Sequence, residues 1–388
     1  MFKTNKKIGI VGGCGHVGLP LSLVLAKKFN VEIIDPSKNK ELIKKGLSPF
    51  KDPGIEHFLN DKIVKKNLIF SSSISKSKSY FDAIIITMGT PVDEWSNPIS
   101  DELINICFNS KKKLKKNGLL ILRSTVTPGL TNKISKELNN INVCYCPERI
   151  VQGKSFTELF QIPQIISTTS KNKKVLDDLK TIFYFAPSFI QSKTTEAELI
   201  KLFNNFWRYS TFAISNQMYL ISENYKVSFS KILSLMKNNY PRAKEIPGAG
   251  LAAGPCLYKD TQQLSAFFPG NFSVGNASLE MNEKIVDYII QKTLKKCKNK
   301  KILILGAAFK ADCDDYRSSL SFKILKNLKR VCQNKIIIFD PYVKHPKVSN
   351  KIQFNQKKDF FILATPHKKF LILSKGIHNN NKVDIWND

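Results

Sequence analysis

The sequence predicts an α/β protein with two doubly wound units that a long central helix and a helical region connect. Two patterns support this fold class. Short apolar runs alternate with helical stretches near both ends of the chain, as in parallel sheets that helices cover on both faces. Between these regions, residues 194–224 carry apolar residues at every third or fourth position, which is typical of one long helix.

In the N-terminal half, six apolar runs have the length of strands: IGIV, VEII, LIF, AIIIT, LLILR and VCYCP. Helical patterns such as residues 18–29 and 101–116 lie between them. We therefore expect a parallel sheet in this half. A second α/β unit is expected to begin at KILILGAAF and to continue through IIIFDPYV and FFILATPH to VDIW.

The middle of the chain is predicted to be helical. Thr195 and Glu198 have the spacing of a capping box at the start of the long helix. Further helices are expected at about 228–238 and 274–296. These patterns divide the chain into three expected domains, which are residues 1–190, 191–297 and 298–388.

The composition is that of a folded protein, since 42% of the 388 residues are hydrophobic and 24% are charged. No apolar run has the roughly 18 residues that a membrane span requires. The first apolar stretch, in MFKTNKKIGIVGG, runs into glycines and predicts a strand rather than a signal peptide. We expect a cytoplasmic protein with no membrane partner.

The formal net charge of +30 is of a size also found in nucleic-acid-binding proteins. Only six of the 61 basic residues are arginine, and the lysines are spread along helices and loops without interleaved aromatic residues. We favour a solvated basic surface, which also attracts anionic small molecules, and we expect no nucleic-acid partner.

Eight cysteines occur without the pattern of a secreted disulfide framework, and we expect reduced thiols. Cys144 and Cys146 form a C-x-C pair of the kind found in zinc sites. The alternation in INVCYCPER favours a strand instead, and no second ligand pair follows. We therefore predict no metal site.

A glycine motif follows the first expected strand. Gly13, Gly15 and Gly18 fit G-x-G-x-x-G, in which the first glycine allows the tight turn, the second admits a pyrophosphate and the third lets helix and strand pack closely. Asp35 ends the next strand, where its carboxylate can bind a ribose 2′-hydroxyl and would repel a 2′-phosphate. His16 is expected to start the helix rather than to act as a base. The pattern favours a Rossmann-like unit that binds NAD over a glycine-rich turn that binds nothing.

A second candidate site is a cysteine in a glycine-rich loop, Gly254-Pro255-Cys256, with Asp260 four positions after it. A thiolate is a strong nucleophile near neutral pH and leaves well from a thioester. Cys256 therefore suits an enzyme that oxidises an alcohol in two steps. An ordinary loop with a buried thiol is the alternative that these residues alone leave open.

The segment GAGLAAGPCLYKDT resembles the catalytic-cysteine segment of the UDP-glucose/GDP-mannose dehydrogenase family. Other stretches resemble the family in the same order along nearly the whole chain: GGCGHVGLPL, KKGLSPFKDPGIEHFL, MGTPVD, RSTVTPG, CPERIVQG, AELIKLFNN, GAAFKADCDDYRSS, FDPYV and ATPH. The resemblance implies an NAD-dependent enzyme that oxidises the C6 hydroxyl of a nucleotide sugar to the carboxylate. It also implies that two NAD molecules are reduced per sugar.

The resemblance implies roles for individual residues as well. Cys256 would form a thiohemiacetal and then a thioester, and Asp260 would orient a water molecule or Lys201. Lys201 and Asn205, four positions apart on one helix face, would hold the reacting oxygen and stabilise the oxyanion. Glu148 would be the base that activates the hydrolytic water.

Arginine and threonine complete the expected sites. By resemblance, Thr125 would position the hydrolytic water or the sugar, and Arg317 would contact the nucleotide sugar across a dimer interface. Arg123, Arg149 and Arg242 also stand beside motifs, and their planar forks suit paired oxygens better than lysine does. The expected cofactor-binding residues are Gly13, Gly15, His16, Val17, Gly18, Asp35, Thr90 and Thr125. The expected substrate-binding residues are Glu148, Lys201, Asn205, Arg242, Gly254, Lys310 and Arg317.

Departures from the UDP-glucose branch of the family bear on the sugar. The chain has PER at 147–149 where that branch has PEF, Gln152 where that branch often has an acid, and Leu130 where threonine is common. PER resembles the branch that oxidises N-acetylhexosamines. We therefore favour UDP-N-acetyl-D-mannosamine or UDP-N-acetyl-D-glucosamine, with UDP-glucose next and GDP-mannose third. The product would serve polysaccharide biosynthesis.

Two other functions are compatible with parts of the pattern. A hydroxyacid or sugar-phosphate dehydrogenase with a single hydride transfer would share the glycine motif and the long helix but would not need Cys256. A basic nucleic-acid-binding or scaffold protein on an inactive Rossmann fold would not need the catalytic set. The long helix carries apolar residues on more than one side, as in LFNNFWRYSTFAI, so we expect it to be buried between domains and to contribute to a homodimer.

Overall fold

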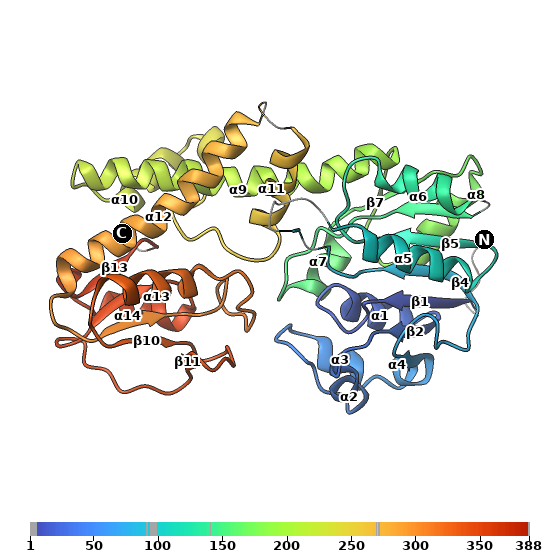
Figure 1. Cartoon of the computed structure of the whole chain (residues 1–388), viewed down its shortest axis with the longest axis horizontal. Helices are drawn as coiled ribbons and strands as arrows, with labels where there is room; N and C mark the ends of the chain where they lie inside the picture. Colours follow the sequence, from blue (N-terminus) through green and yellow to red (C-terminus); the bar gives the residue numbers. More distant parts are fainter. Residues whose placement is uncertain are drawn as a thin grey trace. The chain divides into compact units, whose positions relative to one another are not determined.

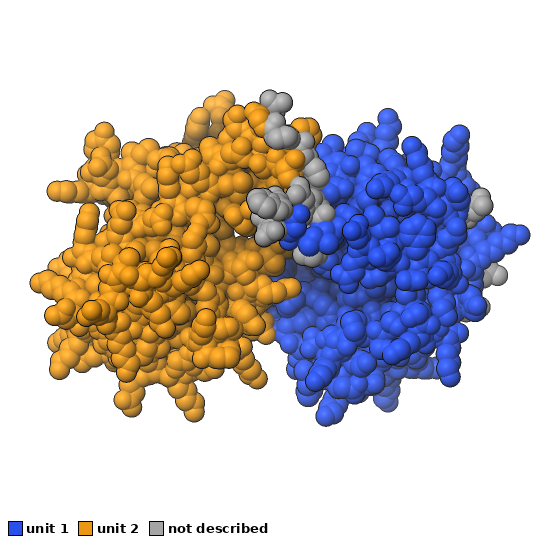
Figure 2. Space-filling view, viewed as in Figure 1, with its two compact units in different colours: residues 1–203 blue, residues 204–388 orange. Residues whose placement is uncertain are grey.

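A computed structural model of the chain describes residues 6–90, 92–93, 99–139, 141–268, 270 and 272–386. The chain divides into two compact units, residues 1–203 and residues 204–388 (Figure 2). Each unit has its own hydrophobic cores. Within the described part of the chain, no helix is both long and apolar enough to cross a membrane.

The first unit is built on a sheet of eight strands in the order β3-β2-β1-β4-β5-β6-β7-β8. The strands are β1 Lys7–Val11, β2 Asn30–Ile34, β3 Leu68–Ser71, β4 Phe81–Ile86, β5 Leu114–Leu122, β6 Asn142–Tyr145, β7 Gln164–Thr168 and β8 Phe189–Gln191. Neighbouring strands are parallel except for β6 and β7, which pair antiparallel.

Helices cover both faces of this sheet, as the sequence predicts. Successive side chains of β4 alternate between two cores, since Ala83 and Ile85 pack into one core and Ile84 and Ile86 into the other. The first core is closed by α1 Gly18–Ala26, α3 Ile55–Leu59, α4 Lys62–Asn67, α7 Ser155–Gln161 and α8 Lys174–Ile182. The second is closed by α5 Asp101–Lys111 and α6 Leu130–Leu138. A short helix, α2 Asn39–Lys44, follows β2.

The second unit joins helices to a smaller parallel sheet in the order β11-β10-β9-β12-β13 (Figure 1). Its helices include α10 Phe229–Lys237, α11 Leu257–Phe267, α12 Ser273–Cys297, α13 Leu320–Val331 and α14 Lys368–Lys375, with 3-10 turns η1 Pro241–Ala243 and η2 Asn379–Asn381. Its strands are β9 Ile302–Leu305, β10 Ile336–Phe339, β11 Val348–Ser349, β12 Phe360–Leu363 and β13 Lys382–Asp384. Helices α12 and α13 pack on one face of the sheet and α14 on the other.

The long helix α9 covers Thr194–Asn224, which confirms the helix predicted at 194–224. Helices α10 and α12 confirm those predicted at about 228–238 and 274–296. The boundary between the two compact units falls within α9, after Phe203. The division into three domains with ends at 190 and 297 stays a prediction.

Two local predictions are wrong. The helix predicted at 101–116 ends at Lys111, because Leu114 already pairs with β4 as the start of β5. The predicted capping box does not form. Glu198 is fully buried and turns instead to the start of α6, where its carboxylate accepts hydrogen bonds from the backbone of Gly129 (2.6 Å) and Thr131 (2.9 Å). A carboxylate is favourable at a helix N-terminus, so Glu198 caps a different helix from its own.

Candidate active site

The glycine-rich loop leads from β1 into α1 and has little room for side chains. A Cβ at Gly18 would clash with the carbonyl oxygen of Gly12 and lie 2.7 Å from the Cα of Gly13. The close packing predicted for the third glycine is therefore confirmed. Gly13 lies within the tight turn that the hydrogen bond from the Gly15 N–H to the Gly12 carbonyl oxygen closes at 3.2 Å, and the left-handed backbone (φ 80°) of this turn is at Gly12.

The same loop leaves space for a ligand. A Cβ at Gly15 would meet only the Gly12 carbonyl oxygen, at 3.4 Å, so a phosphate can approach the backbone there. Asp35 follows β2, and its buried carboxylate accepts hydrogen bonds from the backbone of Cys14 (3.0 Å) and Ser37 (2.8 Å). Each carboxylate oxygen retains a further lone pair for a ribose hydroxyl. These residues fit NAD at the N-terminus of α1.

Two threonines lie beside this loop at the carboxyl ends of neighbouring strands. Thr90 follows β4 and Thr125 follows β5, and the hydroxyl of Thr90 donates to the carbonyl oxygen of Thr125 at 2.7 Å. The sheet continues in opposite directions from β1 and β4, so this edge is a topological switch point, where α/β proteins bind ligands. The structure thus brings together Thr90 and Thr125, two residues that were predicted from separate motifs.

His16 lies just before α1 and contacts two other segments. Its ring centroid is 3.9 Å from that of Phe50, and its Nε2 is 3.2 Å from Nε2 of Gln152. Val17 occupies the cap position of α1. The glycine-rich loop is therefore packed against the segment that follows β6, which carries Glu148.

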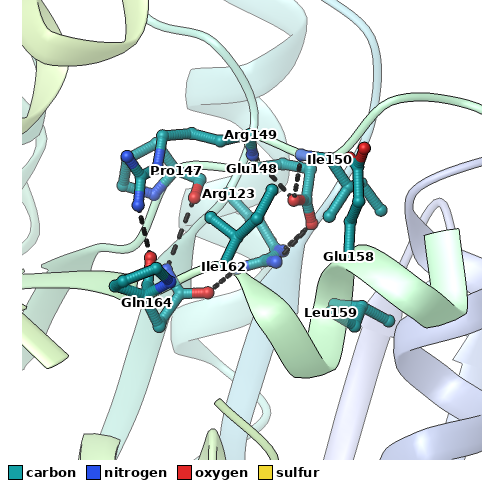
Figure 3. A pocket seen from close by; sticks show the side chains of 10 residues that line it. Arg123, Pro147, Glu148, Arg149, Ile150, Glu158, Leu159, Ile162 and Gln164 are labelled. Carbon is teal, nitrogen blue, oxygen red and sulfur yellow. Dashed lines mark hydrogen bonds and ion pairs between the residues drawn. The ribbon is translucent and has the colours of Figure 1, made fainter. Parts of the chain in front are cut away.

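Glu148 forms a buried ion pair with Arg123 at the end of β5 (Figure 3). Arg123 Nε donates to Glu148 Oε2 at 2.8 Å, and a terminal nitrogen of Arg123 contacts the same oxygen. The other carboxylate oxygen accepts from the backbone of Arg149 (2.7 Å) and Ile150 (2.9 Å). Both oxygens of Glu148 are thus already engaged by the protein.

The rest of the Arg123 guanidinium is also paired. It donates to the Gln164 side chain at 2.8 Å and to the Cys146 carbonyl oxygen at 3.2 Å, and it lies 5.2 Å from the ring centroid of Phe183. A cavity of about 10 Å³ adjoins these residues, which is about the space of one water molecule. Burial lowers the pKa of the neighbouring Arg149, which donates to the carbonyl oxygen of Pro163.

Two more carboxylates hold the segment after Glu148. Glu158 accepts from the backbone of Val151 at 2.5 Å, and Asp52 accepts from the backbone of Gly153 (3.1 Å) and Ser155 (3.3 Å). Neither Glu158 nor Asp52 belongs to the set predicted from the sequence. Asp52 lies within the stretch KKGLSPFKDPGIEHFL, and Glu158 lies five positions after CPERIVQG, but neither stretch indicates that these carboxylates bind the backbone of residues 151–155.

In the second unit, Cys256 directly precedes α11, so the segment predicted as a loop becomes helix after the cysteine. All eight cysteines are described, and Cys256 alone is exposed. Burial raises the pKa of Cys107 and Cys144 to about 12, which makes these thiols poor nucleophiles. The Arg317 guanidinium lies close enough to Cys256 for their charges to interact.

Asp260 lies in the first turn of α11 and is fully buried. Its carboxylate accepts a hydrogen bond of 2.5 Å from the side-chain amide of Asn205 and lies 2.8 Å from the Lys259 ammonium group. Lys201 lies one turn before Asn205 on α9 and is half-buried. The structure therefore pairs Asn205 with Asp260, two residues predicted from separate motifs.

The segment after β9 adjoins the cysteine. The backbone N–H of Gly254 donates to the Ser318 carbonyl oxygen at 3.3 Å, and Arg317 makes a two-pronged ion pair with Asp315. Lys310 lies in the same segment, which follows β9. Arg242 is exposed on η1, with its guanidinium 5.7 Å from the ring centroid of Tyr240.

Asp340 directly follows β10, as Asp35 directly follows β2 in the first sheet. Its carboxylate accepts from the backbone of Ala307 (2.7 Å) and Ala308 (3.1 Å), and lies 3.0 Å from Nε2 of His367. Burial works against the charged form, but the hydrogen bonds from His367 and the backbone outweigh it and lower the pKa of Asp340. Asp340 therefore holds the loop that follows β9.

The matches to known families cover most of the chain. Three domain models of the UDP-glucose/GDP-mannose dehydrogenase family match the chain: the NAD binding domain at residues 6–185, the central domain at 195–284 and the UDP binding domain at 303–387. The chain belongs to this family. It is an NAD-dependent nucleotide-sugar dehydrogenase, and the glycine-rich loop lies in its NAD-binding domain.

Named relatives of this dehydrogenase match over most of their length. The UDP-N-acetyl-D-mannosamine dehydrogenase of Campylobacter jejuni is 26% identical over 92% of this chain and 95% of its own. A UDP-glucose 6-dehydrogenase of the same species is 29% identical over 88% of both chains. The solved UDP-D-ManNAc dehydrogenase of Pyrococcus horikoshii superimposes with a TM-score of 0.84 at 23% identity, covering 96% of this chain and 93% of its own.

The dehydrogenase's paired cysteines at 144 and 146 lie in and just after β6 and are both buried. The predicted strand is confirmed there. In the part of the chain that the structure describes, no group of three or more His, Cys, Asp or Glu residues is placed to hold a metal ion.

Proposed function

We propose that this dehydrogenase oxidises the C6 hydroxyl of a UDP-sugar to the carboxylate in two steps, with Cys256 as the nucleophile that holds the half-oxidised sugar. The observation that supports the proposal most directly is the contrast among the thiols. Cys256 alone is exposed, and it stands at the start of a helix whose first turn carries a buried acid. An exposed thiol at a helix N-terminus is the environment of a reactive cysteine.

In the proposed mechanism, NAD when bound supplies the hydride acceptor for each oxidation. The thiolate of Cys256 adds to the carbonyl carbon of the aldehyde and forms a thiohemiacetal, whose oxidation gives a thioester. Water then adds to the thioester carbon, and Cys256 leaves as the thiolate while the sugar leaves as the carboxylate. The sulfur is therefore regenerated in each turnover.

We propose that Asn205 and Lys201 stabilise the oxygen that carries negative charge in these steps. One N–H of the Asn205 amide donates to Asp260, which fixes the orientation of the amide. The second N–H is then free to point at a substrate oxygen, since an amide group has two donors. Lys201, one turn away on α9, would add a positive charge on the same helix face.

As the water-activating base, Glu148 would need a carboxylate oxygen that can bind water, but both of its oxygens already accept hydrogen bonds from the protein. Its carboxylate accepts hydrogen bonds from Arg123 and from two backbone amides, so both oxygens face the protein. The geometry favours a role for Glu148 in holding the segment that carries Gln152. Thr125, which is half-buried beside Thr90, retains its hydroxyl for the proposed contact with water or sugar.

For the sugar, we propose UDP-N-acetyl-D-mannosamine or UDP-N-acetyl-D-glucosamine, with UDP-glucose as the alternative. The proposal rests on the PER segment and on relatives named UDP-N-acetyl-D-mannosamine dehydrogenase, while the relative named UDP-glucose 6-dehydrogenase supports the alternative. We also propose a cytoplasmic enzyme that supplies polysaccharide biosynthesis. Arg242, Gly254, Lys310 and Arg317 stay the proposed nucleotide-sugar contacts.

We further propose a homodimer formed through α9. Trp207, Ile214 and Ile221 recur every seventh residue on one face of this helix and are 64%, 50% and 51% exposed. Large apolar side chains in such a row are typical of a helix surface that packs on another chain. Light scattering at micromolar concentration tests this, and a monomer would contradict it.

Replacement of Cys256 by serine tests the proposed chemistry. The variant should produce NADH at less than about 1% of the wild-type rate, since a hydroxyl is far less nucleophilic than a thiolate at neutral pH. NADH is followed by its absorbance with each candidate UDP-sugar. A variant that still converts the alcohol to the carboxylate at the wild-type rate would refute the proposal and favour a mechanism without covalent capture.

A further inference from the structure

A buried asparagine of α9 holds the segment that ends in Cys256. The Asn216 side-chain amide donates to the Gly250 carbonyl oxygen at 3.0 Å, and its carbonyl oxygen accepts from the Gly250 N–H at 2.9 Å. Asn216 is fully buried. An amide that pairs with both the donor and the acceptor of one residue fixes that residue's position and orientation, as a strand partner would.

A second asparagine, on α12, fixes the orientation of the first. The remaining N–H of Asn216 donates to Oδ1 of Asn282 at 3.0 Å, and the Asn282 amide donates to the Tyr209 carbonyl oxygen at 3.1 Å. Both asparagines are buried, and both N–H groups and the carbonyl oxygen of the Asn216 side chain are hydrogen-bonded. A buried network of this kind is rigid, and any change of one member leaves another unpaired.

A neighbouring serine adds a second point of attachment to the same segment. The hydroxyl of Ser215 donates to the Pro247 carbonyl oxygen at 2.8 Å. On the other side of the cysteine, Asn205 binds Asp260. Asn205 and Asn216 are eleven residues apart on α9, about 16 Å along the helix axis. The chain that carries Cys256 is therefore tied to α9 both before and after the nucleophile.

At two glycines the segment packs closely against residues that follow strands of the C-terminal sheet. A Cβ at Gly250 would overlap the Trp386 ring, and one at Gly254 would lie 2.6 Å from the Phe309 ring. Gly254 also has a left-handed backbone (φ 103°). These two glycines permit an approach that a side chain would prevent.

We propose that Asn216 and Ser215 are positioning residues that place Cys256 for capture of the aldehyde. They contact neither the sugar nor NAD in this proposal, and they act through the backbone at Pro247 and Gly250. The inference rests on the proposed role of Cys256 as the nucleophile. Cys256 is six positions after Gly250, so a loosened Gly250 lets the thiol move relative to Asn205 and Asp260.

The variant Asn216→Ala removes the attachment and leaves the backbone groups of Gly250 unpaired. A displacement of the nucleophile by 1 Å costs about 100-fold in rate, so kcat should fall on that order. The KM for the UDP-sugar should stay within about threefold, because the lost contact does not touch the sugar. Slower capture also lets aldehyde escape, so NADH per sugar consumed should fall from two towards one, with free aldehyde trapped by hydrazine.

The matched control is Ser278→Ala. Ser278 joins α12 to α9 through Ser210 at 3.0 Å, as Asn282 joins α12 to Asn216. Its hydroxyl also donates to the Val274 carbonyl oxygen at 2.8 Å, and it takes no part in the hydrogen bonds to Pro247 and Gly250. It should lower thermal stability without changing kcat or the NADH yield. If Asn216→Ala folds and retains wild-type kcat and two NADH per sugar, or if Ser278→Ala reproduces its losses, the proposal is overturned.

If Asn216→Ala fails to fold, Ser215→Ala tests the proposal, since it removes only the hydroxyl that binds the same segment at Pro247. A lower kcat with aldehyde release supports the proposal, and wild-type values for both overturn it. The wild-type yield separates this test from that of the proposed function. One NADH per sugar from the wild-type enzyme would refute the role of Cys256 itself, whatever the variants do.

Discussion

Replacement of Glu148 by glutamine removes the charge of a buried ion pair while keeping the size of the side chain. Arg123, its partner, is only 3% exposed and donates two hydrogen bonds to one carboxylate oxygen. An amide at this position must either turn its NH2 group towards the guanidinium or towards the backbone N–H groups of Arg149 and Ile150. Either orientation places donors against donors.

The cost follows from the buried charge that remains. Removal of one partner of a buried ion pair lowers the free energy of unfolding by about 3–5 kcal/mol, because the other charge is left uncompensated. For the first compact unit, residues 1–203, this corresponds to a lowering of Tm on the order of 10 °C. Arg123 keeps its bonds to Gln164 and Cys146, so the unit should still fold.

Thermal unfolding followed by circular dichroism measures this loss, and NADH absorbance measures turnover. The control is Glu41→Gln, which removes an exposed acid 3.3 Å from Lys44 and should leave Tm close to that of the wild type. The double variant Arg123→Met/Glu148→Met should lose less than the sum of the single variants, since it leaves no unpaired charge.

The same variant separates the two roles of Glu148. A residue that holds the segment after β6 lowers Tm when it is replaced, whereas a residue that only activates water leaves Tm unchanged and stalls turnover after a burst of NADH. A Glu148→Gln enzyme with wild-type Tm and a burst would refute the structural role.

Three further predictions concern the two sheets. The pKa of Asp340 is lowered in the folded state, so its contribution to stability is present above about pH 4 and is lost as the pH falls below that value. Asp340→Asn should therefore make Tm depend less on pH in the acid range, as thermal unfolding at a series of pH values measures. Asp35→Ser should weaken NAD binding by about tenfold and reduce the preference over NADP, as measured by fluorescence titration with both cofactors. Gly18→Ala should lower the free energy of unfolding by about 1–3 kcal/mol in a urea titration, because its Cβ would clash with Gly12, and an unchanged midpoint would contradict the packing.

The strands and long helices were predictable because their signal is local. Apolar runs of three to five residues predicted β1 to β6, and periodicity predicted α9 with its observed bounds. The sequence did not reveal β7 and β8. Strand β7 begins with Gln164, whose side chain accepts a hydrogen bond from Arg123, and β8 has only three residues. Neither strand therefore has a distinct apolar pattern.

The partners of the site residues were harder to predict, since they lie far apart along the chain. Glu198 fits a local capping box but binds residues 67 and 69 positions away. The sequence places Glu148 where a base would act, but it does not show that the carboxylate of Glu148 is bound by Arg123. The helix after Cys256 was missed because the glycines before it suggested a loop. For Glu198 and Glu148, a hydrogen-bond partner far away in the sequence replaced the role that the local pattern predicted.

The stoichiometry of NADH formation tests the central claim most directly. The purified protein is incubated with NAD and, in separate reactions, with UDP-N-acetyl-D-mannosamine, UDP-N-acetyl-D-glucosamine, UDP-glucose or GDP-mannose, and NADH is compared with sugar consumed. We expect two NADH per molecule of one UDP-N-acetyl sugar, with the carboxylate as product. One NADH per sugar with free aldehyde would contradict capture of the aldehyde by Cys256.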